Sequence, residues 1–174
     1  VIEVPAAGNA TVTEVGGVGP NGQVFDVAAT ADVVAWTDIV NAPAPDQREP
    51  NITVVDRATG SSTQPPVSCD LIQGCGGKLW CFGLPGPEDT SRPAGSMGFV
   101  DGDTLAPRGT LSGAIGAGCA ADQVYMHNDG VIVAAPDDGS SDLHIEAVLP
   151  RPLNVIDGPV HMENDDAGHL VLGY

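Results

Sequence analysis

A repeat of short apolar segments constrains this 174-residue chain more than any other feature. A polar residue or glycine followed by an apolar run recurs at Asp32 (DVVAWTD), Gly77 (GKLWCFG), Asp122 (DQVYMHND) and Gly168 (GHLVLGY), at intervals of 45, 45 and 46 residues. The apolar stretches are short and rich in Val and Ile, as β-strands are. The chain is therefore predicted to be all-β and built from strand–turn units of about 45 residues.

A second apolar element recurs between these runs, as ITVVDRATGSS at residues 52–62 and VIVAAPDDGSS at residues 131–141. Strand-like segments with a period near 45 residues are typical of the four-stranded blades of a β-propeller. We therefore predict one propeller-like domain over residues 1–174, with three complete units at 21–67, 68–110 and 111–157.

A fourth unit is expected from the two chain ends together, residues 158–174 and 1–20. The chain begins with VIEV and ends with HLVLGY, and pairing these segments would cover two exposed strand edges. A closed ring of four units, a stretch of a larger propeller and an assembly with another chain all fit this pattern. The start at Val1 rather than Met favours a processed mature chain or an excised fragment.

Residues 122–141, DQVYMHNDGVIVAAPDDGSS, resemble a blade of the PQQ-like and related β-propeller repeats. The shared pattern is an apolar strand, a turn with Gly, a second apolar strand and a turn with Asp, Thr and Gly. Residues 32–38 and 52–62 are similar to it as well. The resemblance implies an architecture. It does not imply quinone chemistry, because the Trp that recurs in quinone-binding members is not repeated here, where Trp36 and Trp80 stand alone.

The four cysteines are predicted to form two disulfides. A hairpin centred on Cys75 would place Cys69 opposite Cys81, whereas Cys75 and Cys119 lie near equivalent turns of neighbouring units, 44 residues apart. The spacing does not match the C-x2–4-C pattern of zinc sites. An even number of cysteines favours an extracellular or periplasmic location.

The charge is strongly acidic, with 23 Asp and Glu against 6 Lys and Arg and a net charge of −17. Such a surface repels the phosphates of nucleic acids and of anionic membranes. No run of 18 apolar residues is present, so membrane insertion is not expected either. The expected partner is another protein or another copy of the chain, and cations or simple solvation also suit the charge.

Two sets of residues are candidates for a site. Asp137, Asp138 and Asp142 lie in one acidic turn and offer the carboxylates that Ca²⁺ prefers, although Asp is also an ordinary turn residue. The second set occupies expected inner strands at the mouth of a propeller channel and comprises Asp26, Asp70, His161 and Glu163.

The function predicted from these features is that of a secreted or periplasmic binding or scaffold module, which is not itself an enzyme. Its contact surfaces would be the Pro-rich loops at residues 41–51 and 84–96. Two alternatives stay open. One is a propeller-type hydrolase or lyase that uses the carboxylates at the channel mouth, and the other is a structural subunit that polymerises through open strand edges.

Overall fold

The computed structural model of the chain describes residues 2–3, 13–14, 16, 22–40, 51–67, 69–83, 95–111, 116–128, 130–149, 161–164 and 170–173. Every regular element in these residues is a β-strand, so the all-β prediction is confirmed for this part of the chain. The same residues include no helix with the length and apolar character needed to span a membrane.

Three of the described sheets are four-stranded, antiparallel and connected in chain order. The first contains β3 (Gly22–Ala29), β4 (Val33–Val40), β5 (Asn51–Asp56) and β6 (Ser62–Thr63). The second contains β7 (Leu71–Cys75), β8 (Lys78–Phe82), β9 (Ser96–Asp101) and β10 (Thr104–Thr110). The third contains β11 (Gly116–Ala120), β12 (Gln123–Asn128), β13 (Val131–Pro136) and β14 (His144–Val148).

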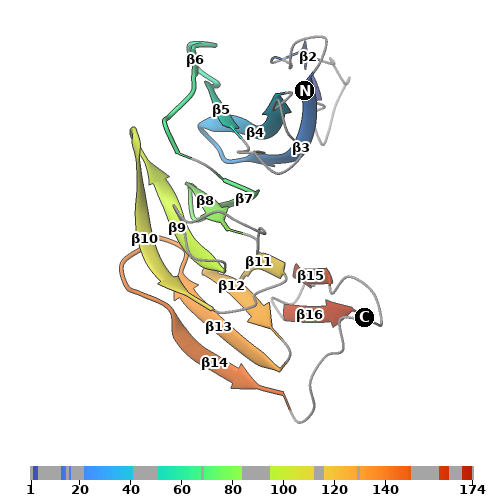
Figure 1. Cartoon of the computed structure of the whole chain (residues 1–174), viewed down its shortest axis with the longest axis vertical. Coiled ribbons are helices and arrows are strands. Elements are labelled where there is room, and N and C mark those ends of the chain that lie inside the picture. Colours follow the sequence, from blue (N-terminus) through green and yellow to red (C-terminus); the bar gives the residue numbers. More distant parts are fainter. Residues whose placement is uncertain are drawn as a thin grey trace.

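The three sheets follow one another along an open arc (Figure 1). Their first strands lie on its inner side, where β3 contacts β7 and β7 contacts β11. Their last strands β6, β10 and β14 form the outer side.

The two chain ends do not share a sheet, so the predicted four-unit propeller is wrong. β1 (Ile2–Glu3) pairs with β2 (Thr13–Glu14), and β15 (His161–Asn164) pairs with β16 (Leu170–Gly173). The described strands therefore form separate sheets, and none of these sheets closes into a ring. Local pairing brings together segments that are close in sequence, at a lower cost in chain entropy than joining both ends.

The second sheet is buried on both faces. In β8, alternate side chains point in opposite directions, and Leu79 and Cys81 pack with Ala35 and Ile52 of the first sheet. Trp80 and Phe82 pack instead with side chains of the third sheet, among them Val124 and Met126. This double burial makes the second sheet the layer that joins the other two.

Strand β10 lacks the apolar pattern of the other strands and contains Pro107 and Gly109. Its pairing with β9 shifts register between these two residues. Pro is tolerated on an edge strand or at a bulge because it cannot donate a ladder hydrogen bond. The outer position of β10 explains how such a sequence is accommodated in the sheet.

The β7–β8 hairpin approaches both neighbouring sheets closely. Its two-residue turn, Gly76–Gly77, has φ values of +56° and +72°, which a type I′ turn requires at both positions. A Cβ at Gly74 would lie 1.8 Å from the backbone oxygen of Ala29, and a Cβ at Gly76 would lie 2.6 Å from that of Asp137. The hairpin therefore needs glycine on each side of Cys75.

We predict that Gly76→Asn destabilises the protein by about 1–3 kcal/mol through a clash with the third sheet. Gly77→Asn is the matched control, because Asn tolerates positive φ and no atom lies within 4 Å of a Cβ there. Urea unfolding of the two oxidised variants measures the difference. Equal losses of stability in both variants would show that the close approach to Asp137 is unimportant.

Candidate functional site

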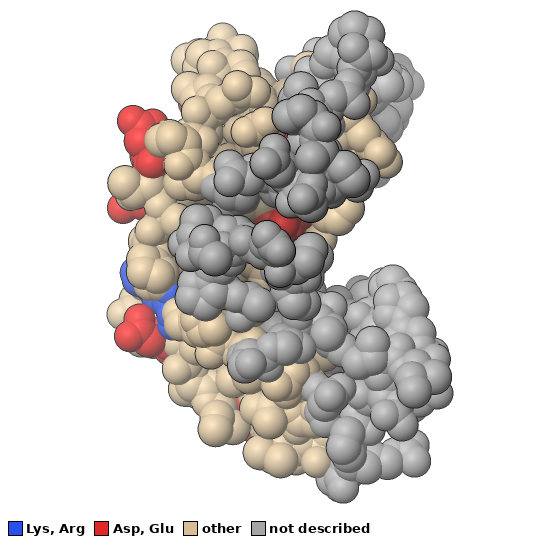
Figure 2. All heavy atoms as spheres, in the orientation of Figure 1, with Lys and Arg blue, Asp and Glu red and all other residues tan. Residues whose placement is uncertain are grey.

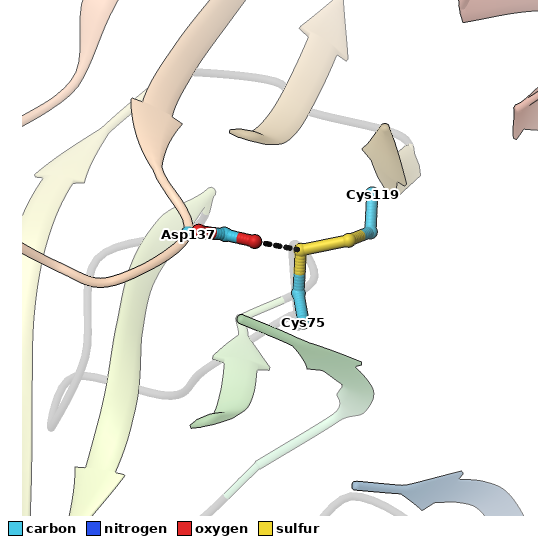
Figure 3. A group of neighbouring side chains, drawn as sticks. All are labelled: Cys75, Cys119 and Asp137. Atoms are coloured by element: carbon cyan, nitrogen blue, oxygen red, sulfur yellow. Dashed lines mark hydrogen bonds between the residues drawn. A yellow bond between two sulfur atoms is a disulfide. The ribbon is translucent and has the colours of Figure 1, made fainter. Parts of the chain in front are cut away.

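The candidate site is the junction between the second and third sheets, centred on the Cys75–Cys119 disulfide. Cys75 ends β7 and Cys119 lies in β11, with their Cα atoms 6.0 Å apart. Figure 3 shows the disulfide between these two strands, with the Asp137 side chain pointing toward Cys75. The bond thus joins two inner strands covalently.

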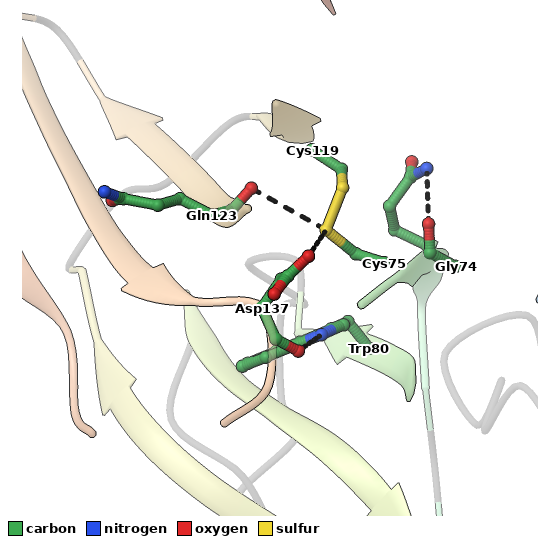
Figure 4. The surroundings of a disulfide bond; sticks show 7 residues. Gly74, Cys75, Trp80, Cys119, Gln123 and Asp137 are labelled. Carbon is green, nitrogen blue, oxygen red and sulfur yellow. Dashed lines mark hydrogen bonds between the residues drawn. A yellow bond between two sulfur atoms is a disulfide. The ribbon is translucent and has the colours of Figure 1, made fainter. Parts of the chain in front are cut away.

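The turn after β13 docks onto the second sheet beside this disulfide. The indole Nε1–H of Trp80 donates a hydrogen bond to the backbone oxygen of Asp137 over 3.2 Å (Figure 4). The Arg108 guanidinium donates from Nε to the backbone oxygen of Gly139 over 2.7 Å. The backbone N–H of Leu143 donates to the backbone oxygen of Arg108 over 2.8 Å. These bonds hold the turn in place independently of the disulfide.

Phe99 is the aromatic centre of this docking surface. Its ring packs edge-on against Trp80, with ring centroids 5.5 Å apart. Lys78 Nζ lies 4.3 Å and Arg108 Cζ lies 4.8 Å from the Phe99 centroid, within the range of cation–π attraction. Two of the six basic residues of the chain thus contact one ring at this junction.

The Asp137 carboxyl lies against a sulfur that cannot donate a proton. Its Oδ2 is 3.8 Å from Cys75 Sγ, and the backbone oxygen of Gln123 is 3.6 Å from the same sulfur. The oxidised sulfur has no hydrogen, so only a protonated carboxyl can donate in the first contact. Burial, followed by the charges of Asp122 and Asp138, raises the pKa of Asp137, which favours the protonated form.

Cys75, Cys119 and Asp137 also form a group of metal-ligating side chains. Their ligand atoms lie within 4.8 Å of one another, a spacing found for no other group of His, Cys, Asp or Glu in the described residues. Thiolates bind metals, whereas a disulfide offers none, so the oxidised junction is a structural crosslink. Reduction would convert the two sulfurs to thiols, whose thiolate forms can bind a metal ion.

The three carboxylates expected to bind Ca²⁺ do not form such a group. Asp137 points to the disulfide, whereas Asp138 Oδ1 accepts a hydrogen bond of 2.8 Å from the backbone N–H of Ser140. This interaction with Ser140 lowers the pKa of Asp138. Asp142 is exposed. The Asp138 contact is ordinary turn chemistry.

The second disulfide joins Cys69 and Cys81, with Cα atoms 5.5 Å apart. Both cysteine pairs agree with the pairing expected from the sequence. The expected strand register of the β7–β8 hairpin, with Cys69 directly opposite Cys81, is wrong. Cys81 lies opposite Ile72, because the turn is at Gly76–Gly77 rather than at Cys75. Cys69 reaches Cys81 from the segment before β7. Two intramolecular disulfides indicate that the chain folds in an oxidising environment.

The described strands form no closed channel for the expected channel-mouth residues to line. Asp26 instead ties the first sheet to the second, since its Oδ2 accepts a 2.8 Å hydrogen bond from the backbone N–H of Ile72. Asp70 precedes β7 and donates from its backbone N–H to Phe82. The side chains of His161 and Glu163 in β15 lie outside the described residues.

His127 is a buried histidine that composition and spacing did not single out. It has no exposed surface, and within the described part of the chain neither ring nitrogen has a hydrogen-bond partner. Burial lowers the pKa of His127, because the charged imidazolium is poorly solvated there. Positions 37, 82 and 127 are 45 residues apart, and Thr37 and Phe82 are buried at the corresponding places in β4 and β8.

A search against protein-family models and a search of curated proteins find no match to this chain. The function is therefore argued from the geometry of the junction and from the charge of the surface. Neither search bears on the resemblance to PQQ-like repeats.

We predict that Cys75→Ala with Cys119→Ala costs about 4 kcal/mol of stability, and Cys69→Ala with Cys81→Ala about 3 kcal/mol. The reason is loop length, because the first bond closes a sequence separation of 44 residues and the second one of 12. Urea unfolding of the two double variants, compared with the oxidised protein, tests the order. A larger loss for the Cys69–Cys81 pair would contradict it.

We predict that His127→Phe stabilises the protein by about 1–3 kcal/mol at pH 7, because an unpaired buried imidazole is removed. The gain should grow as the pH falls below about 6.5, where the unfolded histidine takes up a proton before the folded one does. Urea unfolding at pH 7 and pH 5 measures both effects. His144→Gln, which removes an exposed imidazole, is the control. An equal gain at both pH values would refute the prediction.

Proposed function

We propose that this chain is an extracellular or periplasmic binding or scaffold module that presents a rigid arc of sheets to a protein partner. The observation that carries the proposal is the Cys75–Cys119 crosslink between two sheets that are already docked through Trp80 and Arg108. Such reinforcement reduces relative motion of the sheets. A scaffold benefits from this rigidity, because a pre-organised surface loses less entropy on binding.

The charge of the chain favours a partner with a basic surface. Figure 2 shows acidic atoms of the described residues along the outer edge of the arc, above and below one small basic patch. With a net charge of −17, the chain attracts cationic proteins over about a Debye length, near 8 Å at physiological salt. Of the loops first expected to contact partners, residues 41–51 and 84–96, only Asn51, Gly95 and Ser96 lie within the described residues.

Thiol alkylation in the native compartment tests the location. We expect no cysteine to react before reduction and all four to react after reduction under denaturing conditions, because both pairs are joined as disulfides. Mass spectrometry of the protein recovered from its source counts the alkylated residues. Four thiols that react without reduction would place the protein in a reducing compartment and overturn this part of the proposal.

Partner capture tests the scaffold role. Oxidised wild type, the Cys69→Ala/Cys81→Ala variant and the Cys75→Ala/Cys119→Ala variant serve as baits in fluid from the native compartment at about 0.15 M salt. A scaffold that depends on the junction should retain the same basic partner on the first two baits and lose it on the third. Equal retention on all three baits would show that the crosslink between the sheets has no role in binding.

Self-association is a second candidate function, favoured by the exposed edge strand β14. Ile145 and Val148 are 68% and 71% exposed, and among the described strands β14 is hydrogen-bonded to β13 alone. An edge strand with apolar side chains is a template for pairing with another chain. The chain would then be a structural subunit that assembles through this edge.

Ile145→Lys with Val148→Lys tests the second candidate. If β14 mediates assembly, sizing chromatography at rising protein concentration should show oligomers for the wild type and a monomer for the variant. Asp101→Lys with Asp103→Lys, two exposed positions outside β14, controls for the added charge. A wild type that stays monomeric at every concentration would exclude this function.

A further inference from the structure

We propose that the Cys75–Cys119 pair, when reduced, forms with Asp137 a site for a thiophilic divalent metal ion such as Zn²⁺ or Cd²⁺. The site would combine one thiolate from the second sheet with a thiolate and a carboxylate from the third. It goes beyond the proposed scaffold role, which concerns the oxidised protein.

The spacing of the ligand atoms suits a four-coordinate metal. Zn–S bonds are about 2.3 Å long, so ligands at tetrahedral positions lie about 3.8 Å apart. Cys75 Sγ and Asp137 Oδ2 are already 3.8 Å apart. The two Cα atoms of the cysteines are 6.0 Å apart, so rotation of the freed side chains separates the sulfurs to that distance. The backbone oxygen of Gln123, 3.6 Å from Cys75 Sγ, is a further oxygen at the site.

The three ligands should stay together after the disulfide is broken. Trp80 holds the backbone of Asp137, and Arg108 holds Gly139 in the same turn. The backbone N–H of Asp137 also donates to the backbone oxygen of Asp122 over 3.0 Å. A shared apolar cluster that includes Phe82, Met97, Val124 and Met126 packs the two sheets together. None of these contacts depends on the sulfur–sulfur bond.

Reduction of the Cys75–Cys119 disulfide takes two electrons, which a small-molecule dithiol can supply. The dithiol becomes a disulfide, and Cys75 and Cys119 become thiols. Binding of Zn²⁺ then releases the two thiol protons, and also the proton of the Asp137 carboxyl where that group is protonated, since the metal binds thiolates and a carboxylate. A small-molecule disulfide can reverse the process by taking two electrons from the thiolates, which re-forms the Cys75–Cys119 bond and releases the metal. The charge of the acidic neighbour Asp122 adds attraction for a cation.

The other cysteine pair supplies a matched control within the chain. Cys69 and Cys81 are also buried, yet among the described residues they belong to no group of metal-ligating side chains. If the metal ion bound any reduced cysteine pair, both pairs would bind it with similar affinity. If binding requires the geometry of the junction, only the Cys75–Cys119 pair will bind it tightly.

The test is titration of Cd²⁺ into the full chain after reduction, followed by the ultraviolet charge-transfer absorbance of cadmium–thiolate bonds. The Cys69→Ala/Cys81→Ala variant keeps the junction and should bind one equivalent. The Cys75→Ala/Cys119→Ala variant should bind at least about tenfold more weakly. Asp137→Asn in the first background should weaken binding about tenfold or more, since loss of even an outer partner of a metal ligand costs 10–100-fold. Asp138→Asn, which changes an exposed neighbour, should leave the affinity within about threefold.

Circular dichroism of each reduced sample shows whether the chain remains folded. Unfolding on reduction, equal affinity of the two cysteine-pair variants, or an Asp137→Asn variant that binds as tightly as its parent would each overturn the proposal. Zn²⁺ competition against bound Cd²⁺ then establishes the preferred ion. The scaffold proposal is tested on oxidised protein, so its failure and the failure of this site can be told apart.

Discussion

The contact between the β7–β8 hairpin and its two neighbouring sheets is the constraint on which the rest of the structure depends. On one side of Cys75, Gly74 lies against the backbone of Ala29, and on the other side Gly76 lies against Asp137. Backbones this close leave no room for a side chain at either glycine. The position of Cys75 between the sheets follows from this contact, and so does the reach of its sulfur to Cys119.

The two sheet interfaces differ in the side chains that fill them. The core between the first two sheets consists of Ala, Ile, Leu and Cys, whereas the core between the second and third sheets includes Trp80, Phe82, Met97 and Phe99. A core of Ala and Cys with a few Ile and Leu buries less apolar area per residue than one with aromatic rings, so hydrophobic stabilisation of the first interface is the weaker of the two. The two disulfides add stability by restricting the unfolded chain. The same crosslink that stabilises the arc also places a carboxylate beside a cysteine pair, which links the oxidised scaffold to the metal site proposed for the reduced form.

Much of the fold and part of the site could be predicted because their signals are local. Alternating or continuous apolar runs bounded by Gly and Asp located β8, β12 and β13, and the repeat spacing indicated which cysteines are equivalent. The Cys75–Cys119 pair was predicted from that equivalence, and the Cys69–Cys81 pair from a hairpin centred on Cys75. The register of that hairpin was wrong, because a turn at Gly76–Gly77 and one centred on Cys75 are both consistent with the spacing. Strand β10 could not be recognised from the sequence, because Pro107 and Gly109 interrupt its apolar pattern.

The sequence by itself determined an all-β chain with a repeating strand pattern, an acidic surface and two pairs of cysteines. Only the tertiary structure decided that the chain ends pair locally and that the sheets form an open arc rather than a ring. It also decided that Asp137 meets Cys75 across 62 residues of sequence, and that Asp26 is a structural hydrogen-bond acceptor. The physical reason is the sequence distance over which each kind of interaction acts. Strand and turn propensities act over a few residues, whereas ring closure and the composition of a site depend on contacts between distant segments that no local pattern specifies.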